Sequence, residues 1–557
     1  MFRLVWAALL CGGLASAQPV VSAVLNNYSY VPASLPHHGI AQGSIFVIFG
    51  TGLSNSSTGL QSVPLRTTLE GVSAAVTVGG VTRAAILYYV TPTQVAGILP
   101  SNTPVGAGTI TVTNNGRTSA TAPIRVVQSA FGALTLDGSG TGAAAVFDAA
   151  NQLLGPSNAT HPGDVIVLYG TGAGPSAGDE TVAQTQTNLA NVPILVEIGG
   201  KPATVLYHGR TVFPGLDQIN VALPPDTPTG CAVPVAVSSG IYISNFSTIP
   251  VSASGPHCPA LEGGDPGTTA TEMEMRRWIT AGQFVTGSFG LQRQRLYSLS
   301  QGADGITTRT VATRDLATGG FLRLRGDLER LFLSTSYFVP VVGSCMVSIV
   351  PSSPLAKVLA LPLDAGGSVS VTGPSGSRTI PRLTAPVGLV SYSAEVGDGR
   401  PANFLDAGEY TISVQGGQDI GTFSGSILLA PELEWTNRAE LDVIQRTTGV
   451  TVTWSGGDPT GFVTIQGQSF VTNGTQLTGT TFQCVARNSD RRFTIPATVL
   501  LTLPVSETLE VTPGVFRLQR GALAVASLGT PVRVHATGLD LGSFGSQMTV
   551  VQSTQWR

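Results

Sequence analysis

The sequence predicts an all-β protein built of tandem immunoglobulin-like β-sandwich domains. Three observations support this prediction: apolar residues alternate over short runs, glycine turns separate the runs, and one series of runs occurs twice. Glycine (68 residues) and proline (36) are abundant while 42% of the 557 residues are hydrophobic, which favours many short strands joined by turns over a disordered chain. The length exceeds what one core can fill, so several domains are expected.

The repeated series occupies about residues 43–116 and 163–240. The two copies are offset by 120 residues up to their Gly-Gly turns at 79–80 and 199–200, and by 124 residues further on. The change of offset predicts four extra residues in the second copy, in a loop near His208 to Phe213. Six or seven alternating strands in roughly 100 residues predict an immunoglobulin-like sandwich for each copy.

The second copy also resembles a known domain family. Its start Pro162-Gly-Asp-Val-Ile-Val-Leu-Tyr-Gly-Thr-Gly172, its middle Ile198-Gly-Gly-Lys-Pro-Ala203 and Asp217-Gln-Ile-Asn-Val221 are similar to the uncharacterised family first named from Solibacter proteins. That family is similar in turn to the IPT/TIG immunoglobulin-like domains of cell-surface proteins. The resemblance covers about residues 20–258 and implies an extracellular β-sandwich without a known reaction. The family's domain is typically C-terminal, whereas here more than half of the chain follows it.

Composition and turn positions divide the chain into six expected segments. These are a signal peptide (1–17), repeat 1 (18–128), repeat 2 (129–258), a linker with a β-rich segment (259–335), an immunoglobulin-like sandwich (336–431) and a C-terminal β domain (432–557). The alternation of Met273, Met275 and Arg277 favours a strand in the fourth segment, and a short helix is expected over 496–503. The run Asp406-Ala-Gly-Glu-Tyr410 indicates a tyrosine corner, in which the phenol donates to the backbone a few residues upstream.

The N-terminus indicates export. Arg3 precedes the apolar run Leu4 to Leu14, and Ala15-Ser-Ala17 follows as a small-residue cleavage site. The alternatives are a lipoprotein anchor at Cys11, which the bulky Leu10 disfavours, and a membrane helix, for which the apolar run is shorter than the roughly 20 residues needed. We therefore expect an extracellular or cell-surface protein with no membrane span after cleavage.

Removal of the signal peptide would leave four cysteines. An even number in an oxidising compartment suggests two disulfides. Cys231 and Cys258 flank one expected hairpin and are the favoured pair, and Cys345 with Cys484 follows by elimination. Four buried free thiols remain the alternative.

The candidate motifs for catalysis, for metal or phosphate binding and for nucleic-acid binding are each incomplete in this sequence. A net charge of −3 without a cluster of Lys and Arg disfavours nucleic acid. Ser176 lies in a Gly-x-Ser-x-Gly match that lacks the strand and helix of a nucleophile elbow, and Gly170 to Pro175 lacks the helix of a phosphate loop. Asp137 to Gly142 has too few carboxylates for calcium, and His37-His38 is interpreted as a solvated loop rather than a metal site. We predict no catalytic residue, cofactor or metal.

Three tryptophans are the remaining candidates for a binding surface. Trp278, Trp435 and Trp454 would form ligand platforms for sugar rings if they were exposed, whereas sandwich tryptophans commonly belong to the core. The predicted function is non-catalytic adhesion, or binding of an extracellular glycan or surface protein. The alternatives are a passive structural scaffold and an unrecognised extracellular hydrolase.

Overall fold

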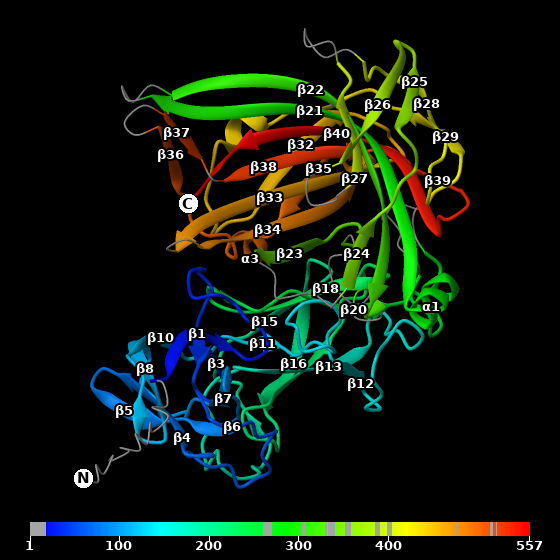
Figure 1. Cartoon of the computed structure of the whole chain (residues 1–557). Helices are drawn as coiled ribbons and strands as arrows, with labels where there is room; N and C mark the ends of the chain where they lie inside the picture. The colour runs from blue at the N-terminus through cyan, green and yellow to red at the C-terminus, as the bar shows by residue number, and fades with distance from the viewer. Residues whose placement is uncertain are drawn as a thin grey trace, which may run out of the picture.

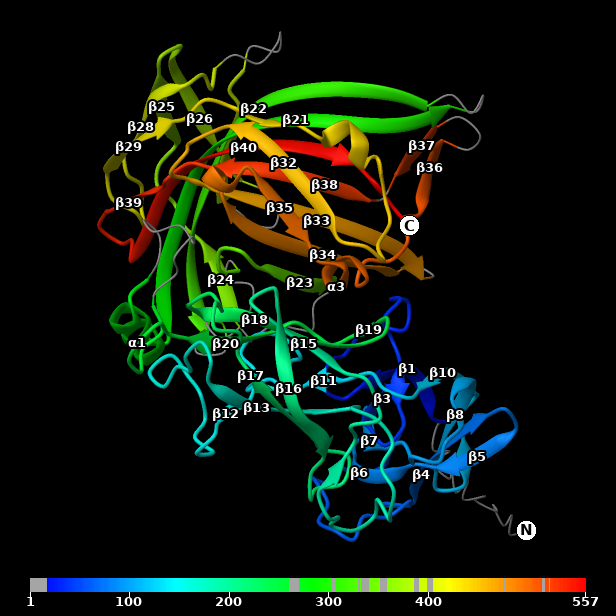
Figure 2. The ribbon, with the colours of Figure 1, turned by 180° about the vertical axis from the view of Figure 1, so that it is seen from behind.

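The structure, a computed structural model, describes residues 18–259, 270–302, 307–328, 331, 340–350, 358–384, 390–397, 404–473, 476–512, 516–519 and 521–557. The protein is all-β in class, as predicted, with short helices between strands. Figures 1 and 2 show the N-terminal repeats in the lower part and one large curved sheet above them. The expected signal peptide lies outside the described residues.

Repeat 1 is a sandwich of two sheets around one core. The first sheet has the order β1-β3-β7-β6, and the second has the order β2-β10-β8-β4-β5 with β9 beside β8. Alternate residues of β4 are buried, as the period-two pattern predicts. The strands are β1 (Val20–Asn26), β2 (Ile40–Ala41), β3 (Ile45–Thr51), β4 (Val72–Val78), β5 (Val81–Ala84), β6 (Ile86–Val90), β7 (Gln94–Ile98), β8 (Gly106–Asn114), β9 (Arg117–Thr118) and β10 (Ala122–Val127).

Repeat 2 uses the same series of strands but joins them into one path. Its order is β11-β13-β17-β16-β15-β18-β19. The long strand β16 occupies the positions of both β5 and β6 of repeat 1, so it pairs with β15 on one side and β17 on the other and connects the two sheets. The strands are β11 (Gly132–Ala133), β12 (Val146–Asp148), β13 (Val165–Thr171), β14 (Thr187–Asn188), β15 (Leu195–Ile198), β16 (Lys201–Arg210), β17 (Asp217–Ala222), β18 (Gly230–Ser239), β19 (Tyr242–Ile243) and β20 (Ser247–Val251).

Strand register locates the length difference between the repeats. A bulge falls between Leu87 and Tyr89 where β6 pairs with β7, and between Val205 and Tyr207 where β16 pairs with β17. Aligning the two bulges places the extra residues at 211–216, between the ends of β16 and β17. This insertion has six residues, and repeat 2 is two residues shorter upstream, so the net difference is the predicted four.

One 16-stranded sheet runs through the C-terminal half. Its central order is β23-β34-β33-β38-β40-β21-β22-β27-β26-β25-β28-β29. The expected segments 259–335, 336–431 and 432–557 each contribute strands, and β21 pairs in parallel with β40 over Thr286 to Tyr297. Boundaries placed at turns therefore do not coincide with a break in the sheet, because the free edge of β21 is completed by a strand about 250 residues away.

The strands of this half have the following bounds: β21 (Gln283–Gly302), β22 (Thr307–Gly326), β23 (Cys345–Val350), β24 (Val358–Pro362), β25 (Ser368–Gly373), β26 (Gly376–Thr384), β27 (Val390–Glu395), β28 (Gly408–Val414), β29 (Phe423–Leu429), β30 (Leu433–Trp435), β31 (Val443–Ile444), β32 (Val450–Gly456), β33 (Phe462–Asn473), β34 (Gln476–Arg487), β35 (Arg492–Ile495), β36 (Thr508–Thr512), β37 (Phe516–Gln519), β38 (Ala522–Leu528), β39 (Val532–Val534), β40 (Leu541–Ser553) and β41 (Gln555–Trp556). Its helices are α1 (Glu272–Ala281) and α3 (Ala497–Leu500), with 3₁₀ turns η2 (Arg438–Leu441) and η3 (Asn488–Asp490).

Local predictions in this half have mixed outcomes. The strand expected around Met273 is wrong: α1 forms there because Thr271 and Glu274 make a capping box, and Gly282 ends the helix in the left-handed region. The short helix expected over 496–503 is present as α3. The tyrosine corner is confirmed, since the hydroxyl of Tyr410 donates to the carbonyl of Phe404.

Both predicted disulfides are present. Cys231 and Cys258 lie 5.1 Å apart between Cα atoms, and Cys345 and Cys484 lie 4.0 Å apart. The second pair faces directly across β23 and β34. It therefore links two neighbouring strands of one sheet, one from the expected segment 336–431 and one from 432–557.

Candidate functional site

The insertion of repeat 2 contacts repeat 1. The hydroxyl of Tyr88 donates to the carbonyl of Pro214. At Gly215 (φ +74°) a Cβ atom would lie 2.6 Å from Ile45, so only glycine allows the loop to approach β3 this closely. Thr171 bridges the repeats, because its hydroxyl donates to Gly215 (2.6 Å) and accepts from the backbone N–H of Ile45 (2.8 Å).

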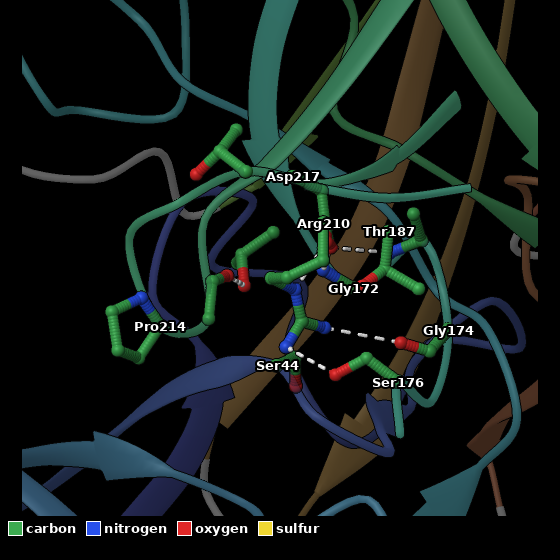
Figure 3. Close-up of polar contacts among 12 residues, drawn as sticks. Ser44, Gly172, Gly174, Ser176, Thr187, Arg210, Pro214 and Asp217 are labelled. Atoms are coloured by element: carbon green, nitrogen blue, oxygen red, sulfur yellow. Dashed lines mark hydrogen bonds and ion pairs between the residues drawn. The ribbon is translucent and has the colours of Figure 1, made fainter. Parts of the chain in front are cut away.

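A buried ion cluster closes the base of this insertion (Figure 3). Arg210 and Asp217 face each other at the ends of β16 and β17, and both are fully buried. The Nε atom of Arg210 donates to Asp217 Oδ1 at 2.6 Å, and its Nη2 atom donates to the carbonyl of Gly174 at 3.1 Å. The other oxygen of Asp217 accepts the backbone N–H groups of Gly172 (2.7 Å) and Ala173 (2.8 Å).

Repeat 1 contributes to the same cluster through Ser101. Its backbone N–H and hydroxyl both donate to the carboxylate of Glu180 at 2.8 Å. Glu180 in turn lies 3.3 Å from Arg210. Burial disfavours the charged guanidinium, but the carboxylates of Asp217 and Glu180 outweigh it and raise the pKa of Arg210. The cluster therefore locks two repeats together through charges that water does not reach.

The charged side chains of this cluster bind one another and groups of both repeats, as in a structural link. Ser176, the serine of the Gly-x-Ser-x-Gly match, lies 3.4 Å from Arg210 Nη1 and donates its own N–H to Ser101. His208, two residues before Arg210 on β16, contacts the carbonyl of Val192, and His161 contacts Asp164 and the carbonyl of Gly255. The predicted interpretation of Ser176 as part of a turn agrees with these contacts, because no described imidazole lies beside its hydroxyl.

The interpretation of His37-His38 as a solvated loop is wrong. His37 is 3% exposed and His38 is 5% exposed. Burial lowers the pKa of His37 to about 3, so its ring is neutral at ordinary pH. The loop is buried because it lies beside the junction of the repeats with the C-terminal half, where a small cavity of about 50 Å³ touches His37, Asn245 and Thr502.

No group of His, Cys, Asp and Glu that could hold a metal occurs among the described residues. In the loop that starts at Asp137, one carboxylate oxygen accepts the backbone N–H of Ser139 (3.0 Å) and the hydroxyl of Thr135 (3.2 Å). These contacts are those of a closed turn.

The tryptophans do not form ligand platforms. Trp278 is 2% exposed, Trp435 5% and Trp454 2%. Trp278, a residue of α1, stacks on Phe284. Trp435 and Trp454 belong to the core beneath the large sheet. Their burial agrees with the core position that sandwich tryptophans commonly have and not with exposed platforms, because each tryptophan lies on the apolar side of its element.

A different surface of the C-terminal half is hollowed. The faces of β33, β38 and β40 that point away from this core carry mostly small or polar side chains. Two adjoining cavities of about 550 and 510 Å³ lie along these faces. We call this surface the trough. Its lining includes Gln292, Gln294, Met346, Ser348, Gln466, Gln468, Thr481, Gln483, Ala522, Ala524, Gln547, Thr549 and Val551, and the two cavities share Gln292 and Gln547.

Strand register explains the shape of the trough. Ala522 and Ala524 on β38 form its floor, because they lie opposite Gln468 and Gln466 of β33 and beside Val551 of β40. Short side chains on the central strand and long ones on its neighbours leave a hollow. The intervening residues, such as Val525, point into the core, as expected for an antiparallel sheet with one buried face.

Two features distinguish the trough from an ordinary solvated face. Among the residues that the structure describes, none that lines either cavity is charged. In addition, Thr549, which is 8% exposed, has a buried hydroxyl without a hydrogen-bond partner, and so has Thr464 in the same row. Native proteins seldom leave such groups unsatisfied.

Our sequence reasoning missed this surface. The available signal was the pair Gln292-x-Gln294 and the pair Gln466-x-Gln468, in which two glutamines share one face of a strand. Only strand pairing brings the two pairs to the same face.

Comparisons with known proteins identify no family for this chain. No family model and no curated protein matches the chain. The plexin A4 extracellular region is 9% identical over 96% of this chain and 31% of that chain, with a TM-score of 0.16. The S-layer protein rSbsC is 9% identical over 96% and 54% (TM-score 0.16), and the ICAM-5 D1-D4 fragment is 11% identical over 86% and 95% (TM-score 0.12).

The chain thus spans about a third of the plexin region and about half of the S-layer protein. Scores this low carry no argument about family or activity. Among the described residues, no helix has the length and apolar character required to cross a membrane.

Proposed function

We propose that this chain is an exported, non-catalytic binding protein. In this proposal the two locked repeats form a rigid support, and the trough of the C-terminal sheet is the binding surface. The observation that carries the proposal is the trough itself, a hollow of two adjoining cavities without charged lining residues among those described, in which glutamine and threonine side chains line the larger cavity. Concave surfaces with a few convergent polar groups are the usual form of ligand sites.

Two further features support an extracellular or cell-surface location. The chain has two disulfides, which persist in oxidising compartments. Its N-terminal sequence has the pattern of a cleaved signal peptide. For the repeats we retain the proposed relationship to the Solibacter-type, IPT/TIG-like domains, which rests on the sequence motifs; the paired bulges support the likeness of the two copies to each other.

A trough-filling variant tests the proposal. The mature chain and Ala524→Trp would be compared on an array of neutral glycans, acidic glycans and extracellular proteins, with Ala107→Trp on the exposed surface of β8 as the control. We expect a ligand that the mature chain and Ala107→Trp bind and that Ala524→Trp does not. Equal binding by all three proteins would refute the trough as the site. Binding of nothing would favour a passive scaffold, and chemical change of a bound glycan would favour a hydrolase.

A further inference from the structure

Building on the proposed function, we infer that the ligand of the trough is a neutral polysaccharide held by the side-chain amides of Gln466, Gln468 and Gln483. The ligand would lie along β38, over the floor of Ala522 and Ala524. Four properties of the trough lead to this ligand class: its charge, its hydrogen-bonding groups, its buried hydroxyls and its length.

The first property is charge. The described lining residues include no Asp, Glu, Lys or Arg. An acidic polysaccharide or a nucleic acid would place its anions against a surface with no cation to pair with them, which costs free energy as the groups lose water. A ligand without charge meets no such penalty.

The second property is the glutamine amides. Each amide offers two donors and an acceptor in one plane, which suits sugar hydroxyls that both donate and accept. Gln466 and Gln483 face each other across β33 and β34, with Gln466 Nε2 3.4 Å from Gln483 Oε1. The remaining oxygen of Gln466 and nitrogen of Gln483 make no hydrogen bond to any residue described in the structure, so both are available to a ligand.

The third property is the unsatisfied hydroxyl of Thr549, which lies in the lining of the larger cavity. A buried hydroxyl without a partner destabilises the free protein. The hydroxyl is enclosed as it stands, but Thr549 lies in the cavity lining, so a rotation about its χ1 would turn the hydroxyl toward the trough, where a ligand hydroxyl supplies the missing hydrogen bond.

The fourth property is length. The seven residues of β38 span roughly 20 Å at about 3.4 Å per residue, and the second cavity continues beyond Leu528 to Pro531. Such a length suits a chain of several sugar rings. An extended peptide is less suitable, because peptides usually add to the edge of a sheet through their backbone, whereas the strands beneath the trough are already paired on both sides.

The first experiment measures binding of the full mature chain by affinity electrophoresis and calorimetry. The probes are neutral polysaccharides (glucans, mannan, xylan and galactan) and acidic ones (alginate and polygalacturonate). We expect binding to at least one neutral polysaccharide, and about four- to hundredfold weaker binding by the double variant Gln466→Ala/Gln468→Ala, since each lost hydrogen bond accounts for roughly two- to tenfold. The matched control is Gln415→Ala/Gln418→Ala, two exposed glutamines in the loop after β28, which should bind as the original chain does.

The second experiment uses Thr549→Val, which keeps the shape and removes the hydroxyl. We expect about three- to tenfold weaker binding to the same polysaccharide together with a higher melting temperature of the free protein. A purely structural role would instead lower the melting temperature. Opposite signs in the two measurements therefore support the inference, and a lower melting temperature with unchanged binding contradicts it.

The outcomes separate this inference from the proposed function. No binding to any neutral polysaccharide, or equal binding by the glutamine variant and its control, overturns the inference. A protein or acidic ligand that Ala524→Trp fails to bind also overturns it, yet leaves the trough as the binding site. A ligand that Ala524→Trp still binds refutes the trough itself.

Discussion

Repeat 1 and repeat 2 share their strands but differ in what they contact. Both carry the same Gly-Thr-Gly run, at Gly50 to Gly52 and at Gly170 to Gly172, and the same bulge in the hairpin that follows. In repeat 1 this hairpin turns directly from β6 to β7. In repeat 2 the six residues at 211–216 extend it onto β3 of repeat 1. The difference shows that one insertion in a repeated framework adds a contact surface between the copies, beside contacts such as that of Ser101 with Glu180.

The largest expected effect comes from removing the cation of the cluster. Arg210→Met should lower the free energy of local opening around β13 and β17 by about 3–5 kcal/mol, because it leaves Asp217 and Glu180 buried without a counter-charge. Native-state hydrogen exchange with mass spectrometry measures this free energy for peptides of each repeat. The repeat 1 control Arg83→Met, whose guanidinium contacts only exposed groups, should change it by less than about 0.5 kcal/mol.

Adding Glu180→Gln to Arg210→Met should restore part of the loss, since one uncompensated charge is removed. Similar small effects of Arg210→Met and Arg83→Met would contradict the role assigned to the cluster.

A matched pair of threonines provides a finer comparison. Thr171→Val removes a buried hydroxyl that bridges Ile45 and Gly215, and should cost about 2 kcal/mol because both backbone groups lose their partner. Thr51 occupies the equivalent position of repeat 1 and is exposed. Thr51→Val should therefore have almost no effect. Hydrogen exchange of β3 would show the difference, and equal values for the two variants would disprove the bridging role.

The smallest expected effect is the weakening, as the pH rises, of a histidine contact that repeat 1 lacks. His161 lies 3.0 Å from Asp164 through Nδ1 and 3.0 Å from the carbonyl of Gly255 through Nε2. Two acceptors favour the protonated ring, so the Asp164 carboxylate and the Gly255 carbonyl raise the pKa of His161 above 6.5. The stabilisation is fully present below pH 6.5 and is lost as the pH rises through the folded-state pKa.

An NMR titration of His161 measures this pKa, and hydrogen exchange near Gly255 between pH 6 and 8 reports the loosening. His161→Ala should abolish the dependence. Repeat 1 has Ala41 at the matching position, and its turn should show none. A pKa at or below 6.5 would contradict the prediction.

Local signals in the sequence were reliable where one short segment decides the structure. The alternation of β4 and the run around Tyr410 predicted a strand and a corner that the structure contains. Alternation misled at Met273, because the capping box of Thr271 and Glu274 makes the local backbone helical. The offset of the repeats located the insertion near its true place, yet it revealed only the net difference and no contact with Ile45.

Burial was harder to predict than secondary structure. His37 is polar and lies in a loop, so its sequence favoured exposure, but the C-terminal half covers it. The tryptophans offered no sign of which face they occupy. The trough depends on Gln292 and Gln547 lying opposite each other, in a pairing between strands that are distant in the chain.

The sequence by itself determined the all-β class, the doubled strand series and the tyrosine corner, and it favoured the two disulfide pairs over free thiols. Period-two alternation and turn glycines act over a few residues and need no knowledge of partners, whereas Cys345 and Cys484, 139 residues apart, were paired by elimination. The tertiary structure alone decided that β21 pairs with β40, that the insertion docks on repeat 1, and that glutamines from separate strands share one hollow face. These outcomes depend on which sheet edges and surfaces meet, because pairing between distant strands is settled by the packing of the whole chain.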